Sequence, residues 1–439
     1  MRFGRPELER AAFWAAFAAC TSVVVSIAAC QILMGAAIVL LIVSRTRLRL
    51  PPVWLPMALF MTGTVVSWLL SGDLRRGLPQ IRKFYVWFIL LLVFSVFRRL
   101  RDVRWAVAAW TALATGSALY GFVQFAGKYE KAAASHQNFY LSYVDARITG
   151  FMGHWMTFGG EEMIVLLWLA AFLFFAPAGT SAQDAASSLK TRDRTPDASV
   201  VRGSMERLRA AGWICGGILL VSMVIGFTRG IWLGTVAGGI YLLWFRRRWL
   251  VAIVPVAILA AMAVAPLRER AISLFQPHGE RDSNRFRVVV WRTGLEMVRA
   301  HPWFGVGLEQ VRPQLDKYVP PDIARPLPPG YYGHLHNIYI HYAAERGVPT
   351  MLAMMWLIGQ ALWDFARTLW RRRPSGDARF VLHAAVAVII GLLVVGCVEY
   401  NLGDSEVLTM FLATVCFGYL AKESVEREWP RHAPPAHLI

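Results

Sequence analysis

The feature that most constrains the fold of this chain is a series of apolar segments along its length. Charged residues, proline or glycine bound twelve of them, at 11–26, 28–43, 53–70, 82–97, 105–126, 158–177, 211–228, 230–245, 249–266, 348–370, 381–400 and 405–420. About 20 apolar residues are enough for a helix to cross the hydrocarbon core of a bilayer. We therefore predict an all-α polytopic membrane protein with about twelve transmembrane helices.

The distribution of charge predicts how these helices are oriented. The chain has a formal net charge of +18, and Lys and Arg concentrate at both termini and in every second connection. Those segments hold 26 Lys and Arg against 11 Asp and Glu. Positively charged loops usually stay on the cytoplasmic side of a membrane. The pattern predicts cytoplasmic termini and accounts for most of the net charge, so a nucleic-acid partner is not needed to explain it.

Three regions follow from this layout. Residues 1–266 hold the first nine predicted helices, with a flexible cytoplasmic loop at about 178–210. Residues 267–347 are predicted to form a large, mostly helical loop domain on the non-cytoplasmic side, and residues 348–439 hold the last three helices and a cytoplasmic tail. The long loop contains five of the ten histidines and eleven Lys and Arg, on the side where positive charge is normally sparse. This concentration predicts that the loop carries the functional site.

A helix is predicted near the start of this loop, from Asp282 to Ala300. Apolar residues recur on it at helical spacing, at Val288, Trp291, Leu295 and Val298. Its other side carries Arg285, Arg292 and Arg299, and Arg287 projects between the two sides. We interpret it as an amphipathic helix that can lie at the membrane–water interface on the non-cytoplasmic side.

Cysteine and histidine spacing gives no metal site. The five cysteines all lie inside apolar runs and have no CxxC spacing, so we interpret them as small core residues. His334 and His336 are spaced like two zinc ligands, but no cysteine or compact set of carboxylates completes the group. We expect no metal.

Two sets of arginines are candidates for binding an anion. Arg229 lies in the few residues between two apolar runs, where a charge usually faces a cavity or a charged partner. Arg285 and Arg287 precede Trp291 on the predicted helix. Guanidinium groups form bidentate hydrogen bonds that match phosphate oxygens, so a diphosphate is the best fit. A simpler reading, in which these arginines contact solvent or lipid headgroups, stays open.

The third candidate is the histidine-rich stretch from His334 to Pro349, which leads into the apolar run at 348–370. A histidine near its ordinary pKa can act as a general base toward a hydroxyl group, or as a cation beside a leaving phosphate. His336 is the first choice for either role, and Asn337 and Tyr339 follow it directly. We expect His334 and His341 to be supporting or structural residues.

Three ordered motifs resemble those of the O-antigen ligase and polymerase superfamily. They are Thr228-Arg229-Gly230-x-Trp232, the segment from Trp291 through His301-Pro302-Trp303-Phe304-Gly305-Val306-Gly307, and His336-Asn337-x-Tyr339 continuing to Glu345-Arg346-Gly347. Residues 220–360 carry the specific part of this resemblance. It implies a metal-independent, inverting glycosyltransferase of the membrane GT-C type in the bacterial inner membrane, with its active site at the periplasmic face.

The resemblance also implies roles for single residues. Arg229 and either Arg285 or Arg287 would bind the diphosphate of an undecaprenyl-linked glycan, and His336 would act at the transfer centre. The remaining matches are possible supporting residues: Arg82, Arg147, His154, Asn337, Tyr339 and Glu345.

The expected reaction transfers O-antigen from undecaprenyl diphosphate to a sugar of lipid A–core. An O-antigen or exopolysaccharide polymerase, or a protein O-oligosaccharyltransferase, would use the same chemistry. A transporter or flippase for polyprenyl-linked glycans is the alternative of another class. We favour an enzyme because the basic residues and histidines concentrate on one face, whereas transporters place their sites near the bilayer midplane.

Overall fold

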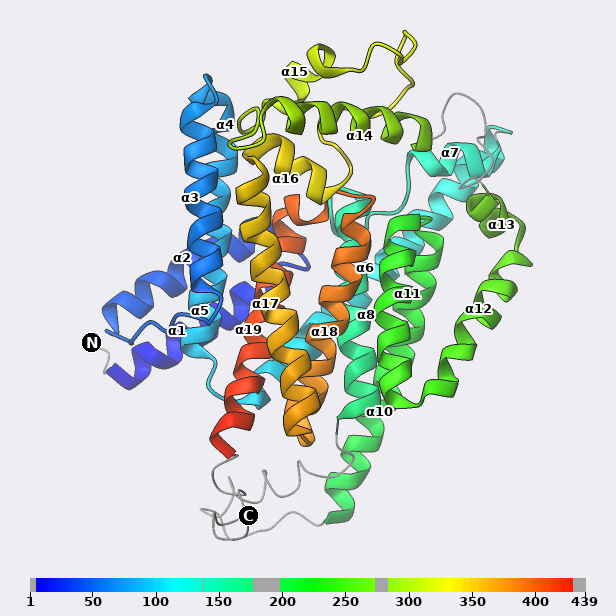
Figure 1. Ribbon diagram of the computed structural model, residues 1–439. Helices are drawn as coiled ribbons and strands as arrows, with labels where there is room; N and C mark the ends of the chain where they lie inside the picture. The colour runs from blue at the N-terminus through cyan, green and yellow to red at the C-terminus, as the bar shows by residue number, and fades with distance from the viewer. Residues whose placement is uncertain (1–4, 137, 177–197, 273–282, 429–439) are drawn as a thin grey trace, which may run out of the picture.

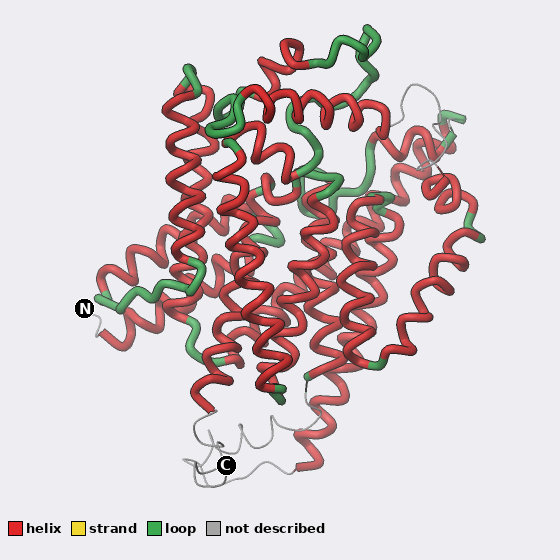
Figure 2. Tube along the Cα trace, viewed as in Figure 1, coloured by secondary structure: helices red, strands yellow, loops and turns green. Residues whose placement is uncertain are grey.

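The protein is described here by a computed structural model, which describes residues 5–136, 138–176, 198–272 and 283–428. The described residues form helices and loops and contain no strand (Figure 2). The α-helices are α1 (Arg5–Ser22), α2 (Ile27–Val43), α3 (Trp54–Leu70), α4 (Leu74–Arg82), α5 (Phe88–Val96), α6 (Leu100–Ala134), α7 (Phe139–Asp145), α8 (Trp155–Phe175), α10 (Ala198–Ile225), α11 (Arg229–Arg246), α12 (Ile253–Met262), α13 (Ala265–Ile272), α14 (Ser283–Ala300), α15 (Val311–Tyr318), α16 (Ile338–Arg346), α17 (Val348–Arg372), α18 (Gly376–Gly396) and α19 (Ser405–Glu428). Short 3₁₀ helices are η1 (Lys83–Trp87), η2 (Arg248–Ala252) and η3 (Asn401–Gly403).

Most of the long helices stand side by side as a bundle, and α14 lies across one end of it (Figure 1). The helices α8, α18 and α19 are buried over most of their length, whereas α10 is largely exposed. The starts of α6, α10 and α18 and the ends of α11, α17 and α19 lie at the end opposite α14. The basic segments of the sequence therefore gather at one end of the bundle, and the long loop covers the other.

The helical membrane architecture is confirmed, but the number of crossings stays a prediction. Each predicted apolar run coincides with a helix or with consecutive helical turns. By length and composition, six described helical segments can cross a membrane: Leu74–Val96, Leu100–Ala134, Trp155–Phe175, Glu206–Ile225, Gly376–Gly396 and Ser405–Glu428. The first two predicted spans, now α1 and α2, run obliquely to the bundle (Figure 1).

The predicted flexible loop at 178–210 is wrong for its last part. Residues 198–210 are helical and begin α10, and residues 178–197 lie outside the described residues. Gly203 is the only strong helix breaker between 198 and 210. The helix that leads into the next apolar run therefore starts earlier than the charge of this segment indicated.

Helix α14 has a second apolar side that the sequence analysis did not identify. Val288 and Leu295 of the predicted apolar face are exposed. Phe286, Val290 and Met297 are instead buried, in a small core shared with Leu335 and Ala344 from the histidine-rich stretch. This packing fixes α14 against α16.

The turn after α14 runs beside the end of α16. The N–H of Val306 donates to the carbonyl of Ala344 (2.8 Å), and the N–H of Val348 donates to that of Pro302 (2.8 Å). Gly347 has φ +85°, and a Cβ there would lie 2.1 Å from the Trp303 oxygen. Only glycine fits this close approach. These contacts fix the position of α16 relative to α17.

Two glycines let α11 lie directly against α18. Gly234 and Gly238 are spaced as in GxxxG pairs, which bring helix backbones together in membranes. A Cβ on Gly234 would lie 2.7 Å from the Gly391 oxygen, and one on Gly238 would lie 2.7 Å from the Ala387 oxygen. This contact places the N-terminus of α11, with Arg229, beside the connection between α18 and α19.

We predict that Gly238→Ala destabilises the protein and that the neighbouring Gly239→Ala does not. A Cβ at Gly239 meets no atom within 4 Å, so alanine there should raise helix stability slightly. Overpacking at Gly238 should cost about 1–3 kcal/mol. Thermal unfolding of both variants in detergent, followed by size-exclusion chromatography, measures the difference. Equal melting temperatures would show that α11 does not depend on this contact.

Candidate active site

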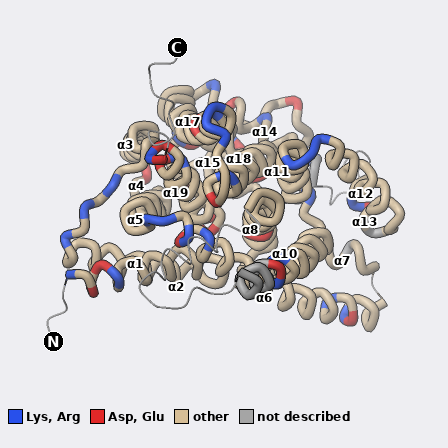
Figure 3. The backbone as a smooth tube through the Cα atoms, turned by 90° about the horizontal axis from the view of Figure 1, so that it is seen from below, with Lys and Arg blue, Asp and Glu red and all other residues tan. Residues whose placement is uncertain are grey.

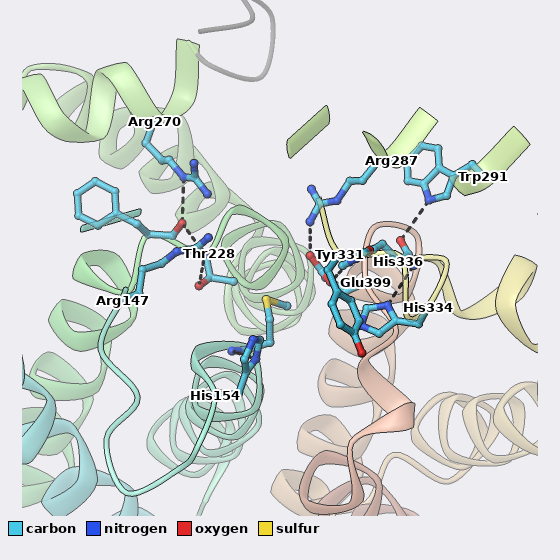
Figure 4. A network of polar contacts seen from close by, with 12 residues as sticks. Arg147, His154, Thr228, Arg270, Arg287, Trp291, Tyr331, His334, His336 and Glu399 are labelled. Carbon is cyan, nitrogen blue, oxygen red and sulfur yellow. Dashed lines mark hydrogen bonds and ion pairs between the residues drawn. The ribbon is translucent and has the colours of Figure 1, made fainter. Parts of the chain in front are cut away.

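The candidate site lies below α14, where the loop before α16 meets the connection between α18 and α19 (Figure 4). His336 takes a left-handed backbone conformation, with φ +45°. Its Nδ1 lies 3.1 Å from Oε2 of Glu399, and its Nε2 lies 3.2 Å from the carbonyl oxygen of Tyr331. Both ring nitrogens therefore face oxygen acceptors, and a doubly protonated imidazole satisfies both contacts.

Glu399 is the residue that holds this arrangement together. Its second carboxylate oxygen, Oε1, forms an ion pair with Arg287 from α14. Burial alone would raise the pKa of Glu399, but the hydrogen bond with His336 and the charges of Arg287, His336 and Arg147 lower it. The carboxylate is therefore ionised at neutral pH and bonded to both Arg287 and His336. We call Arg287, His336 and Glu399 the Glu399 cluster.

The sequence analysis did not identify Glu399. It was counted as part of the apolar run at 381–400. A lone carboxylate at the end of such a run was the available signal, because ionisable residues at membrane depth usually have a charged partner.

The two candidate arginines of α14 are placed differently. Arg287 reaches Glu399, whereas Arg285 is exposed. Trp291, one turn further along the helix, donates from its indole N–H to the His336 carbonyl (3.3 Å). Phe286 packs edge-on against the His336 ring, with centroids 5.0 Å apart. The face of α14 that bears Arg287 thus orients His336.

Arg147 and Arg270 lie on the opposite side of the site from the Glu399 cluster (Figure 4). Arg147 donates to the Thr228 hydroxyl (3.3 Å) and to the carbonyl of Val144 (3.0 Å), both neutral oxygens. Arg270 of α13 is buried and donates to the carbonyl of Phe227 (3.0 Å). Arg229 is also buried, as the first residue of α11. We call Arg147, Arg229 and Arg270 the arginine group.

The positive charges of this group act on one another. Burial, followed by the charge of Arg270, lowers the pKa of Arg147 to about 9. The charges of Arg229 and Arg287 contribute to this lowering, and the charge of Glu399 opposes it. Buried cations that repel one another in this way form a favourable site for a multivalent anion. Arg270 was missed by the sequence analysis because a short, strongly charged segment, Arg268-Glu269-Arg270, hides it among solvent-exposed charges.

The N-terminus of α11 joins the arginine group to the Glu399 cluster. A Cβ on Gly230 would lie 3.5 Å from Cγ of Glu399 and 3.1 Å from Val398. Arg229, next in the chain to this glycine, is thus held near the buried carboxylate. Three motifs far apart in sequence therefore meet in one place.

Two of the possible supporting residues, His154 and Arg82, differ in their position relative to the site. His154 caps α8 and lies between the two groups in Figure 4. Burial, followed by the charge of Arg147, lowers its pKa, so His154 is neutral at physiological pH. Arg82 is exposed, and no contact among the described residues links it to the site. The next residue, Lys83, donates instead to the carbonyl of Gly403 (2.7 Å).

Asn337 and Tyr339 attach α16 to the end of α18. Asn337 caps α16 by accepting the N–H of Ile340 (2.9 Å), and its amide donates to the Cys397 carbonyl (2.9 Å). The Tyr339 hydroxyl donates to the Leu393 carbonyl (2.8 Å). Both residues therefore position His336 beside Glu399.

The neighbouring histidines have structural contacts. The His334 ring lies against His336, with centroids 4.1 Å apart, and its Nδ1 accepts the His336 N–H (3.3 Å). Burial, followed by the charge of His336, lowers the pKa of His334 to about 2. His341 is buried, and its Nδ1 faces the Leu335 N–H at 3.4 Å. These contacts fix the loop that carries His336.

Glu345 belongs to a separate buried network. Its carboxylate accepts the N–H of Glu309 (2.8 Å) and lies 2.6 Å from Arg346. Burial would raise the pKa of Glu345, but Arg346 and then His341 lower it to about 2. The Ser67 hydroxyl donates to the Glu345 carbonyl (2.9 Å), which links α16 to α3. Glu345 therefore stabilises the framework around the site.

We predict that Glu345→Gln lowers the thermal stability of the protein strongly. The substitution leaves Arg346 buried without a counter-charge, which costs about 3–5 kcal/mol. The exposed pair Arg292 and Asp322 provides the control, because water screens exposed pairs and they contribute little to stability. Melting temperatures of Glu345→Gln and Asp322→Asn, measured at equal detergent concentration, test this. Similar values for both variants would contradict the structural role of Glu345.

Among the described residues, no group of three or more His, Cys, Asp and Glu side chains is placed to hold a metal ion. Chemically, the site combines a carboxylate-bound imidazole with guanidinium groups on two sides. Such a site can bind a diphosphate and bring a hydroxyl group to an imidazole nitrogen.

Comparison with known families agrees with the motifs. Residues 214–355 match the family model described as O-antigen ligase, and no curated protein matches the chain. The matched segment contains Arg229, Arg270, Arg287 and His336, whereas Arg147 and Glu399 lie outside it. The match confirms the predicted resemblance: over residues 214–355, this helical membrane protein carries the pattern of the O-antigen ligase superfamily.

Proposed function

We propose that this protein is an O-antigen ligase of the bacterial inner membrane. It transfers O-antigen polysaccharide from undecaprenyl diphosphate to a sugar hydroxyl of lipid A–core. The observation that carries the proposal is that Arg147 and Arg270 lie across the site from the Glu399 cluster, and that Arg147 interacts electrostatically with Arg229, Arg287 and Glu399. The family match supports a glycan-transferring enzyme more broadly.

The donor's diphosphate would bind to the arginine group. Arg147, Arg229 and Arg270 come from different elements, so together they can contact oxygens on both phosphates. In the reaction, the bond between the anomeric carbon and the diphosphate oxygen breaks, and its electrons leave with the diphosphate. The arginines stabilise the negative charge that develops there. We propose that this replaces a metal ion, so the reaction needs no metal cofactor.

The acceptor hydroxyl would approach His336. Its oxygen attacks the anomeric carbon from the side opposite the leaving group, which inverts the configuration. Glu399 holds Nδ1, so Nε2 is the nitrogen that can exchange the Tyr331 carbonyl for the acceptor hydroxyl. If His336 is neutral when the acceptor binds, Nε2 takes the hydroxyl proton. If it is protonated, it acts as a cation beside the leaving diphosphate, and the diphosphate takes the hydroxyl proton. Glu399 supports both roles.

The proposed orientation follows from charge. The basic helix ends gather opposite α14 (Figures 1 and 3). With those ends in the cytoplasm, both termini are cytoplasmic and the site opens at the periplasmic face. A lipid-linked donor and lipid A–core would then both reach the site from the outer leaflet of the inner membrane.

We predict that His336→Gln and Glu399→Gln each lower ligation about 10²–10⁴-fold, the usual effect of removing an acid–base group. The measurement is gel electrophoresis of lipopolysaccharide from a strain that lacks its own ligase. Loss of ligation leaves bare core while lipid-linked polymer accumulates. Core that stays bare in this strain even with the wild-type protein would instead indicate a polymerase, or a flippase if the donor is trapped on the cytoplasmic side.

Wild-type levels of capped core in His336→Gln would contradict the proposed role of this residue. Turnover by the purified protein should also continue in the presence of a chelator. A reaction that stops with chelator and resumes with added metal would contradict metal independence.

The two arginines of α14 provide a matched test. We predict that Arg287→Gln abolishes detectable ligation, because it removes a cation and leaves Glu399 without its ion pair. Arg285→Gln removes the same charge from the same helix, but its side chain is exposed, so ligation should stay within about twofold. Initial rates with purified donor and acceptor measure both. Equal losses would show that general positive charge, and not the Glu399 contact, is what matters.

A further inference from the structure

A large cavity lies at the end of the bundle opposite the candidate site. Its volume is about 1250 Å³, which exceeds the roughly 300–1,000 Å³ of most small-molecule pockets. The first turns of α6 form one wall. The ends of α8 and α19 and parts of α10 and α18 form the others. None of its lining residues belongs to the arginine group or to the Glu399 cluster.

One part of the cavity wall is strongly basic. Arg98, Arg99 and Arg101 line it and are exposed, and no ion pair involves them among the described residues. Arg104 also lines it but is bound in an ion pair with Asp377. Basic positions at this end of the bundle are visible from below in Figure 3. Among the described residues, Arg98, Arg99 and Arg101 thus line the cavity without an ion-pair partner.

The rest of the wall is apolar. It is formed, further along the helices toward the centre of the bundle, by Ala108, Ala112, Leu169, Phe172 and Cys215. From Arg101 to Ala112 the helix rises by about 16 Å, at 1.5 Å per residue. One leaflet of the hydrocarbon core is about 15 Å thick. The cavity therefore has the length of one leaflet, with its cations at one end.

An aromatic residue marks the boundary between the two parts. Trp105 is 44% exposed, and the Arg101 guanidinium lies 5.2 Å from its ring centroid. Tryptophan concentrates where hydrocarbon meets headgroups. The arginines thus lie at headgroup level, and the apolar wall lies at acyl-chain level.

We propose that this cavity binds an anionic phospholipid. The headgroup phosphate contacts Arg98, Arg99 and Arg101, and the acyl chains lie along α6 and α10. Charge complementarity selects this occupant, because basic pockets between membrane helices bind acidic headgroups. A soluble anion would leave the apolar wall uncovered, and a neutral lipid would leave the three guanidinium groups without a counter-charge. This inference does not depend on the proposed ligase activity.

Native mass spectrometry of the purified full-length protein tests the proposal. The probes are phosphatidylglycerol and phosphatidylcholine, titrated separately into the detergent-solubilised protein. The wild type should bind one phosphatidylglycerol more tightly than any phosphatidylcholine. Changing Arg98, Arg99 and Arg101 together to Gln should weaken that binding on the order of 100-fold, since each cation contributes severalfold. Millimolar inorganic phosphate should not displace the lipid.

Two further variants separate the cavity from general surface charge. Changing Arg371, Arg372 and Arg373 to Gln removes three exposed charges at the same end of the bundle but outside the cavity, so binding should not change. Ala112→Trp keeps every charge but places a bulky ring in the apolar part, so binding should weaken. Equal binding of the two lipids by the wild type would overturn the proposal. So would displacement by phosphate, equal losses in the two triple variants, or full binding by Ala112→Trp.

Discussion

The buried carboxylate of Glu399 is the interaction on which the candidate site depends. An ionised group can stay buried only when charges or hydrogen bonds compensate for the lost water. Arg287 and His336 provide that compensation, and they come from α14 and from the loop before α16. Because both must reach the same carboxylate, the position of the long loop over the bundle is fixed by one residue between α18 and α19. The site is thus assembled by a charge requirement as well as by apolar packing.

The remainder of the loop is shaped to make that contact possible. Gly347 and Gly305 let the turn after α14 run against the end of α16, and the Glu345–Arg346 pair holds the same region to α3. The close contact between α11 and α18 places the N-terminus of α11, with Arg229, beside Glu399. Residues of the histidine-rich stretch therefore divide into two kinds. His336 faces the site, whereas Asn337, Tyr339 and Glu345 fix its position.

The sequence allowed the helical membrane class and the segments that carry the site to be predicted, because apolar run lengths and motif order are local properties. Contacts between distant segments were not predictable in the same way. Arg285 and Arg287 are equivalent by spacing, and only the packing of Phe286 and Val290 on the histidine loop decides which one reaches Glu399. Glu399 and Arg270 lie outside the recognised motifs, so their roles depend on tertiary contacts. The number of membrane crossings also stays a prediction, since several apolar helices are short or oblique.

The Glu399 cluster and the arginine group differ in how their positive charges are compensated, and this difference explains why the two groups are separate. At the Glu399 cluster, Arg287 and the His336 imidazole share one carboxylate, so the charge of Arg287 is compensated there. At the arginine group, the hydrogen-bond acceptors of Arg147 are neutral oxygens, and neighbouring arginines lower its pKa. An arrangement of this kind is costly in the absence of ligand, and an anion that binds all three guanidinium groups relieves the repulsion. Glu399 binds Arg287, so Arg287 can orient His336, while Arg147, Arg229 and Arg270 form the proposed diphosphate site. The Glu399 carboxylate thus separates the residues that position His336 from those proposed to bind the anion.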